Sequence, residues 1–135
     1  MYDYEFTLPI YGVIKQTKHN KNAAITLNWY CNAHRYTRNN AKKKFKQMMS
    51  EQINSFDAIG DGFKLSLHYE YYAKKNGTDL DNFVCVARKF FQDAMSELGF
   101  IPDDNTKVIV RNSESYAGVD RDNPRIVVKV NKIPT

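Results

Sequence analysis

One segment, Phe63 to Ala73, constrains the fold more than any other part of the chain. Its sequence, FKLSLHYEYYA, alternates apolar and polar residues over its whole length. Successive side chains of a β-strand point to opposite faces, so this alternation predicts a strand with one buried face. Turn residues follow at Lys74 to Thr78, and a helical pattern with one apolar face then runs from Asp81 to Leu98. The chain must therefore accommodate a strand, a turn and a helix in succession.

Five further segments supply the other expected elements. A first long helix is expected at about Ala33 to Ile53, and the remaining strands at Tyr2–Pro9, Ala24–Tyr30, Lys107–Arg111 and Arg125–Val130. The polar stretch from Asn112 to Pro124 is typical of a hairpin with a long tip. The 135 residues show no internal repeat or domain boundary. We expect a single α+β domain over residues 1–135, with a mixed sheet of about five strands and two main helices.

The positive charge of the chain is concentrated in its first third. Between Glu5 and Glu51 there are nine Lys and Arg residues and no acid, although the whole chain has a net charge of only +5. Such a block favours a polyanionic partner such as DNA, and a solvated helix face is the alternative. Phosphate contacts position DNA without reading its bases. The residues predicted to make them are Lys15, Lys18, Lys21, Arg35, Arg38, Lys42, Lys43 and Lys46.

Two cysteines, Cys31 and Cys85, are too far apart in the sequence for a short metal-binding motif, and nothing requires them to form a disulfide. The N-terminal segment has an early acid and no long apolar run, which is unlike a signal peptide. No stretch approaches the roughly 18 apolar residues of a membrane span. We therefore expect a cytoplasmic protein with no membrane partner.

Acidic residues gather at both ends of the second predicted helix. Asp79 and Asp81 lie where the turn gives way to the helix, and Asp103 and Asp104 follow its other end. Either acid of the first pair is also a common N-cap residue. If the strand at Lys107–Arg111 pairs beside the strand that precedes the helix, the two pairs of acids could approach one another. Converging carboxylates require a cation, and hard oxygen ligands select Mg²⁺ or Mn²⁺.

The same helix also carries a polar stripe. At 100° per residue, Asn82, Lys89 and Asp93 project in nearly the same direction. Lys89 and Asp93 could form an ordinary i,i+4 ion pair, which contributes a few tenths of a kcal/mol. Alternatively, Lys89 contacts a phosphate or orients a metal-bound water.

These motifs together resemble the RusA family of Holliday junction resolvases. The matching runs are Asp79-Leu80-Asp81-Asn82, Asp93-Ala94-Met95, Gly99-Phe100 and Asp103-Asp104, within residues 78–104. The resemblance implies a homodimeric, Mg²⁺-dependent endodeoxyribonuclease (Mn²⁺ being possible) that resolves four-way DNA junctions in recombination and repair. The family is frequent in phages and prophages, so the resemblance also implies that the cell is a bacterium or a phage-infected host. Nuclease action on other branched DNA, such as flaps or forks, and DNA binding without catalysis remain the alternatives.

The resemblance also implies roles for individual residues. The metal ligands would be Asp79, Asp81 and Asp104, with Asp103 assisting, and Lys89 would be the catalytic lysine. Asn82 and Asp93 would support the site. The spacing from Asp81 to Asp93 is about one helical turn longer than in the familiar bacterial member. Counted from the first motif, the lysine position would instead be Cys85.

Overall fold

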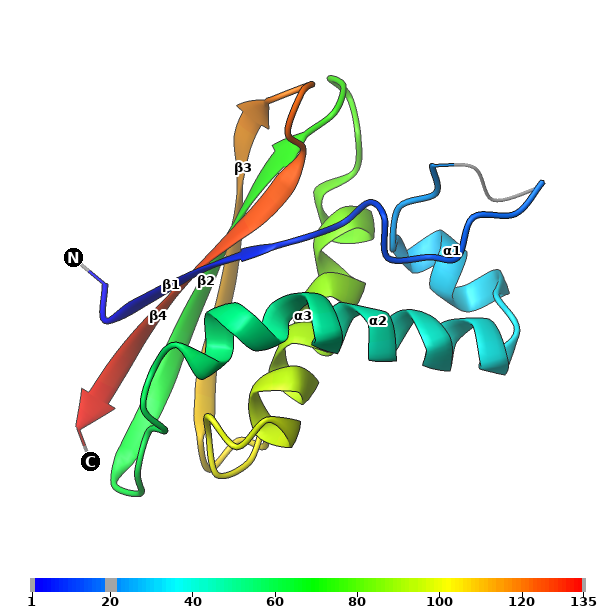
Figure 1. Cartoon of the computed structure of the whole chain (residues 1–135). Coiled ribbons are helices and arrows are strands. Elements are labelled where there is room, and N and C mark those ends of the chain that lie inside the picture. The colour runs from blue at the N-terminus through cyan, green and yellow to red at the C-terminus, as the bar shows by residue number, and fades with distance from the viewer. Residues whose placement is uncertain (1, 19–21, 135) are drawn as a thin grey trace.

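A computed structural model describes residues 2–18 and 22–134 of the chain. Within these residues the protein is an α+β fold with a mixed four-stranded sheet and three helices, two of them long (Figure 1). The elements in chain order are β1 (Tyr4–Leu8), α1 (Leu27–Asn32), α2 (Arg35–Asn54), β2 (Phe63–Ala73), α3 (Leu80–Glu97), β3 (Ile109–Val119) and β4 (Arg125–Pro134).

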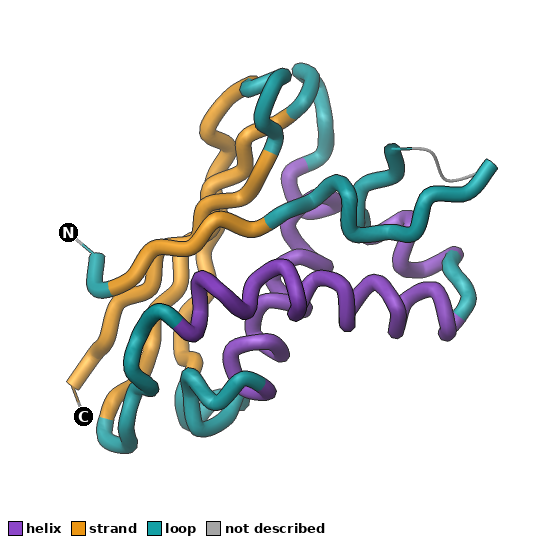
Figure 2. The backbone as a smooth tube through the Cα atoms, viewed as in Figure 1, coloured by secondary structure: helices purple, strands orange, loops and turns teal. Residues whose placement is uncertain are grey.

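The sheet has the strand order β1-β4-β2-β3, with the helices gathered on one of its faces (Figures 1 and 2). β4 is antiparallel to both β1 and β2, whereas β2 and β3 are parallel. The register pairs Leu65 with Ile109 and Ala73 with Val119. α3 is therefore the crossover helix that returns the chain from the end of β2 to the start of β3.

The core lies between the inner face of the sheet and the helices. Of the alternating apolar residues of β2, Leu65, Leu67, Tyr69 and Tyr71 are buried at 0% exposure, and only Phe63 at the start of the strand is exposed. Phe91 of α3 packs edge-on against the ring of Tyr69, at 6.5 Å between centroids. This packing holds α3 firmly against β2, so residues along α3 have fixed positions relative to the sheet.

Five predicted elements are confirmed, most of them with changed bounds. The first and last predicted strands are β1 and β4, at Tyr4–Leu8 and Arg125–Pro134. The strand Phe63–Ala73 is found at its predicted limits, and the two long helices occupy Arg35–Asn54 and Leu80–Glu97. Gly99 follows the end of α3 with a φ of +78°, a backbone conformation that glycine adopts without strain.

The predicted strand Ala24–Tyr30 is wrong, which is why the sheet has four strands rather than about five. Residues Leu27–Asn32 form the short helix α1. The Thr26 side chain caps this helix by accepting a hydrogen bond from the backbone N–H of Trp29, at 3.1 Å. A local side-chain acceptor thus outweighs the β-propensity of the segment.

The predicted hairpin between the last two strands is also wrong. β3 continues to Val119, and only residues 120–124 connect it to β4. β3 and β4 do not pair with each other but lie on opposite sides of β2. The polar residues that resembled a loop belong to an edge strand with few buried side chains.

A glutamine side chain protects the outer edge of β1. The Gln52 side chain accepts a hydrogen bond from the backbone N–H of Thr7 and donates one to the backbone C=O of Thr7, both at 2.9 Å. The amide of α2 therefore bonds to the edge of β1 as a neighbouring strand would. It also ties the C-terminal half of α2 to the sheet.

We predict that Gln52→Ala lowers the free energy of unfolding by about 1–2 kcal/mol, because two backbone groups lose their partner at a partly exposed site. Urea unfolding followed by circular dichroism measures this change. Gln47→Ala, on an exposed part of the same helix, is the matched control and should leave stability within about 0.5 kcal/mol of wild type. Equal effects of the two substitutions would contradict the edge-capping role.

Candidate functional site

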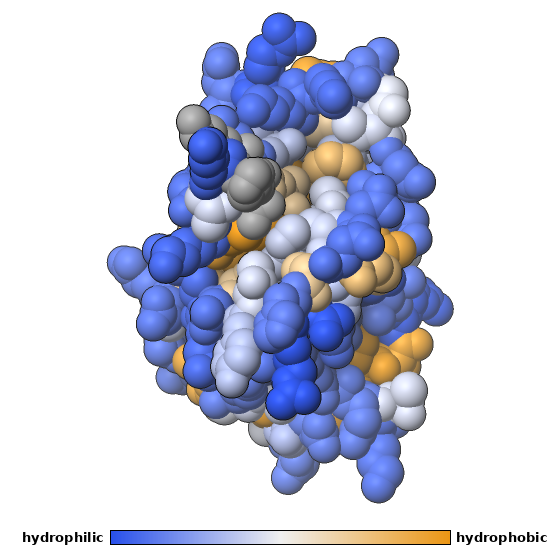
Figure 3. All heavy atoms as spheres, turned by 90° about the vertical axis from the view of Figure 1, so that its right-hand side faces the viewer, coloured by the Kyte–Doolittle hydropathy of each residue, from blue (hydrophilic) through white to orange (hydrophobic). Residues whose placement is uncertain are grey.

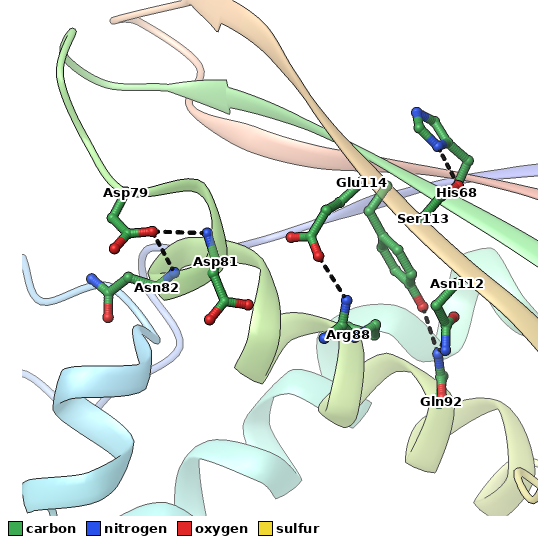
Figure 4. A network of polar contacts seen from close by, with 10 residues as sticks. His68, Asp79, Asp81, Asn82, Arg88, Gln92, Asn112, Ser113 and Glu114 are labelled. Carbon is green, nitrogen blue, oxygen red and sulfur yellow. Dashed lines mark hydrogen bonds and ion pairs between the residues drawn. The ribbon is translucent and has the colours of Figure 1, made fainter.

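The first group of acids, Asp79 and Asp81, lies at the N-terminus of α3. Asp79 is the N-cap residue: its Oδ1 accepts hydrogen bonds from the backbone N–H groups of Asp81 and Asn82, at 3.1 and 3.4 Å (Figure 4). Asp81 occupies the first helical turn, where the helix dipole favours a negative charge. Both acids are exposed. The N-cap alternative is therefore what the structure shows for Asp79, although its second carboxylate oxygen is not used in the cap.

Asn82 joins α3 to α1. Its Oδ1 accepts a hydrogen bond from the backbone N–H of Asn28, at 3.0 Å. Of the three residues predicted to share a polar stripe, Asn82 is thus engaged with α1, whereas Lys89 and Asp93 contact each other at 4.0 Å. Asn82 fixes the short helix α1 beside the N-terminus of α3.

The second group of acids lies near the other end of α3 and consists of Asp93, Asp103 and Asp104. Asp103 accepts hydrogen bonds from the backbone N–H of Asp104 and from the Asn105 side chain, at 2.7 and 3.0 Å. A hydrogen bond with Asp93 holds the pKa of the Asp104 carboxyl above its usual value, and partial burial and a hydrogen bond with Asp103 raise it further. Two ionised carboxylates in contact repel each other, so the pair favours sharing a proton. A bound cation would relieve the same repulsion.

Lysines of α2 and α3 surround this second group. Lys42 Nζ lies 3.1 Å from Asp93 Oδ2, and both Lys42 and Lys46 lie 3.9 Å from Glu97. Burial alone would lower the pKa of Lys42, but its hydrogen bond with Asp93 and the nearby negative charges raise it overall. Lys89 is 57% exposed and 4.0 Å from Asp93. Lys42 and Lys46, which were predicted to bind DNA, thus neutralise acids of α3, while Lys89 remains accessible.

The two groups of acids do not meet within one chain. β3 pairs with β2 as the prediction supposed, but the pairing is parallel, so Asp103 and Asp104 lie near the start of β2 and Asp79 follows its end. Asp104 is hydrogen-bonded to Asp93, which follows Asp81 by 12 residues on α3, so about 18 Å of helix separates the two groups. Among the described residues, no three His, Cys, Asp or Glu side chains are placed to hold a metal ion. The carboxylates of a single chain therefore do not fit the implied metal site of Asp79, Asp81 and Asp104.

The other predicted DNA-binding residues form a basic strip on α2 and the β1–α1 loop. Its exposed members are Lys15, Lys18, Arg35 and Lys43, together with the adjacent Lys44. Lys15, Lys43 and Lys44 line one cleft of about 500 Å³, which brings cations from two distant parts of the sequence together. Arg38 lies over the ring of Tyr30, at 5.0 Å from its centroid. Lys21 lies outside the described residues.

A network of polar contacts that the sequence did not predict joins α3 to the sheet (Figure 4). Arg88 donates to Glu114 of β3 at 3.2 Å, and Gln92 donates to the Tyr69 hydroxyl and to Asn112 Oδ1 at 3.0 and 2.8 Å. Burial raises the pKa of the Tyr69 hydroxyl well above its usual value. The i,i+4 spacing of Arg88 and Gln92 indicated a shared face. Their partners Glu114 and Asn112 lie in the part of β3 beyond Arg111, which the sequence did not predict to be a strand.

Comparison with known proteins adds no family assignment, since no family model and no curated protein matches the chain. Within the described residues, no helix has both the length and the apolar character needed to cross a membrane. Both cysteines are free, with Cys31 exposed and Cys85 partly buried.

We predict that Asp79→Ala lowers the free energy of unfolding by about 1 kcal/mol, because α3 loses its N-cap. Asp79→Ser should retain most of that stability, since a serine hydroxyl also accepts N-cap hydrogen bonds. Thermal and urea unfolding of both variants measure the difference. The serine variant thus removes the carboxylate while leaving the helix intact. A serine variant as unstable as the alanine variant would contradict the capping role.

We predict that Asp104→Asn raises the melting temperature at pH 7 by about 1–3 °C, a small effect because the site is largely hydrated. The folded-state pKa of Asp104 is raised, so the folded protein holds this proton more tightly and loses stability as pH rises from the unfolded value of about 3.8 through the folded value. The advantage of the variant should therefore disappear below about pH 4. Melting curves from pH 3 to pH 8 test this, and an advantage independent of pH would contradict it.

Proposed function

We propose that the protein is a metal-dependent endodeoxyribonuclease of the RusA type, which cuts branched DNA, most concretely a four-way junction, as a homodimer. The observation that carries this proposal is the position of the two acid groups at opposite ends of α3. Because the groups lie at opposite ends of a long helix, each is placed to meet the other group of a second copy of the chain. The resemblance of residues 78–104 to the RusA motifs supports the same function.

A two-fold symmetric dimer would bring together the two acid groups that are far apart in one chain. If α3 packs antiparallel to its copy, Asp79 and Asp81 of one protomer approach Asp103 and Asp104 of its partner. A two-fold axis creates this arrangement twice, and a four-way junction has paired equivalent cleavage positions. The resulting oxygen donors are those that Mg²⁺ and Mn²⁺ select. Lys89, exposed on α3 between the two groups, would face the DNA backbone.

The edges of the sheet favour one geometry for this dimer. β1 has only five residues, and Gln52 occupies part of its edge. β3 is an edge strand of eleven residues that contains neither proline nor lysine, the residues that commonly protect such edges. Antiparallel pairing of β3 with its copy about an axis perpendicular to the sheet would keep both sets of helices on one face. The two α3 helices would then also be antiparallel.

DNA binding without catalysis is the second candidate. It is favoured by the N-cap role of Asp79 and by the separation of the acid groups in a single chain. The basic strip containing Lys15, Lys43 and Lys44 would serve either function, because phosphate contacts are needed in both. Action on flaps or forks would use the same residues.

We predict that the protein nicks a synthetic four-way junction in Mg²⁺, and that Asp81→Asn and Asp104→Asn each lower the nicking rate at least about 100-fold by removing a charged ligand. Denaturing gels of end-labelled junctions measure the rates. The matched control is Asp57→Asn, an exposed acid outside both groups. Wild-type binding without nicking would favour the non-catalytic candidate, and nicking by Asp81→Asn would contradict the site.

Mixing the two inactive variants tests whether the site is shared. In a dimer of one Asp81→Asn and one Asp104→Asn protomer, one site would contain both intact acids and the other would contain neither. Random reassortment makes half of the dimers mixed, so we expect about a quarter of wild-type activity. A site built within one chain would leave every site damaged, and the mixture would stay inactive.

A further inference from the structure

Two adjoining pockets form a groove beside α1 and the N-terminus of α3. Their volumes are about 740 and 420 Å³, and they share Tyr11, Asn22, Lys75 and Phe83 in their walls. Figure 3 views the side of the molecule that carries α1, where a paler and partly apolar floor lies between hydrophilic rims. The groove belongs neither to the acid groups nor to the basic strip on α2.

The larger pocket combines aromatic rings with amide groups. Tyr11, Trp29 and Phe83 supply flat apolar surfaces, and Asn28 and Asn32 supply hydrogen-bond donors and acceptors. Aromatic faces bind bases by stacking, whereas amides can pair with the polar edges of a base. Such a combination suits a single planar heterocycle. A paired base cannot use it, because its edge and both of its faces are already engaged within the duplex.

The smaller pocket is cationic. Lys74, Lys75 and Arg121 line it, and no acidic residue does. None of the three forms an ion pair with another described residue. Lys74 lies over the ring of Tyr11, with 5.2 Å between Nζ and the ring centroid, so the cationic and aromatic parts are in contact. Unpaired cations beside a polar aromatic pocket favour an anionic ligand with a planar group attached.

We propose that this groove binds an unpaired nucleotide of a DNA strand, with its phosphate at Lys74, Lys75 and Arg121 and its base in the aromatic pocket. This inference rests on the proposed function and deepens it: flaps and forks carry unpaired nucleotides, and a four-way junction would supply one only where base pairing opens at its crossover. The groove adjoins the first acid group, because Asn28 in its wall bonds Asn82 of α3. A strand seated there would leave the groove beside Asp79 and Asp81.

Trp29 reports directly on the groove, because it is the only tryptophan in the chain. The experiment titrates the full-length protein with an eight-nucleotide oligothymidylate in EDTA and follows tryptophan fluorescence. We expect saturable quenching, and about tenfold weaker binding of an abasic oligomer of the same length, which keeps the phosphates and lacks the bases. A duplex of the same length should leave the Trp29 emission unchanged.

Charge variants separate the groove from general attraction to DNA. Lys75→Ala/Arg121→Ala should weaken binding of the oligothymidylate about tenfold by removing two phosphate contacts. The matched control, Lys64→Ala/Lys107→Ala, removes the same charge near the start of β2 and should bind within about twofold of wild type. Equal weakening by both double variants, equal affinity for the abasic oligomer, or an unresponsive Trp29 would each overturn the proposal.

Binding to the groove is measured in EDTA and nicking is measured in Mg²⁺, so the two experiments can fail independently. Quenching with the expected selectivity, together with no nicking of a junction in Mg²⁺, would support the groove and contradict the nuclease. Nicking without any quenching would contradict the groove alone. Quenching by free thymidine monophosphate at the same concentration would show a mononucleotide pocket and would overturn recognition of a strand.

Discussion

The parallel pairing of β2 with β3 determines most of the structure. Parallel neighbours cannot be joined by a tight turn, so the chain must return along the whole sheet before β3 begins. α3 makes that return, and its apolar face covers β2 as it does so. The same geometry places the residues just before α3 at one end of the sheet and the residues just after it at the other.

This constraint explains why the acids of one chain are separated. An antiparallel β2–β3 pair would have brought Asp103 and Asp104 back to the turn that carries Asp79. The sequence motif is compatible with either pairing, because it specifies residue types and spacing but not strand direction. The contacts of Arg88 and Gln92 with β3 hold the helix in the parallel arrangement. The site shared between two copies that we propose would use both acid groups.

The sequence predicted those elements whose periodicity reflects burial on one face. Phe63–Ala73 alternates because one face of β2 meets the helices, and the two long helices carry regular apolar stripes. α1 was missed because Thr26, a single capping residue, decides its conformation. The strand predicted at Lys107–Arg111 ends too early because an edge strand buries few side chains, so residues such as Ser113 and Ser115 give no hydrophobic signal. Strand direction, which decides where the acids lie, depends on contacts between distant segments and has no local signature.

α3 also gives its two acid groups different electrostatic settings. At its N-terminus the positive end of the helix dipole lies beside the negative charges of Asp79 and Asp81 and stabilises the helix. Near its C-terminus the dipole disfavours negative charge, and contact with Asp93 raises the pKa of Asp104. The second group therefore favours retaining a proton unless a cation replaces it. A metal held between two copies would relieve the repulsion between the carboxyl groups of Asp93 and Asp104, so assembly of the dimer and binding of the metal would stabilise each other.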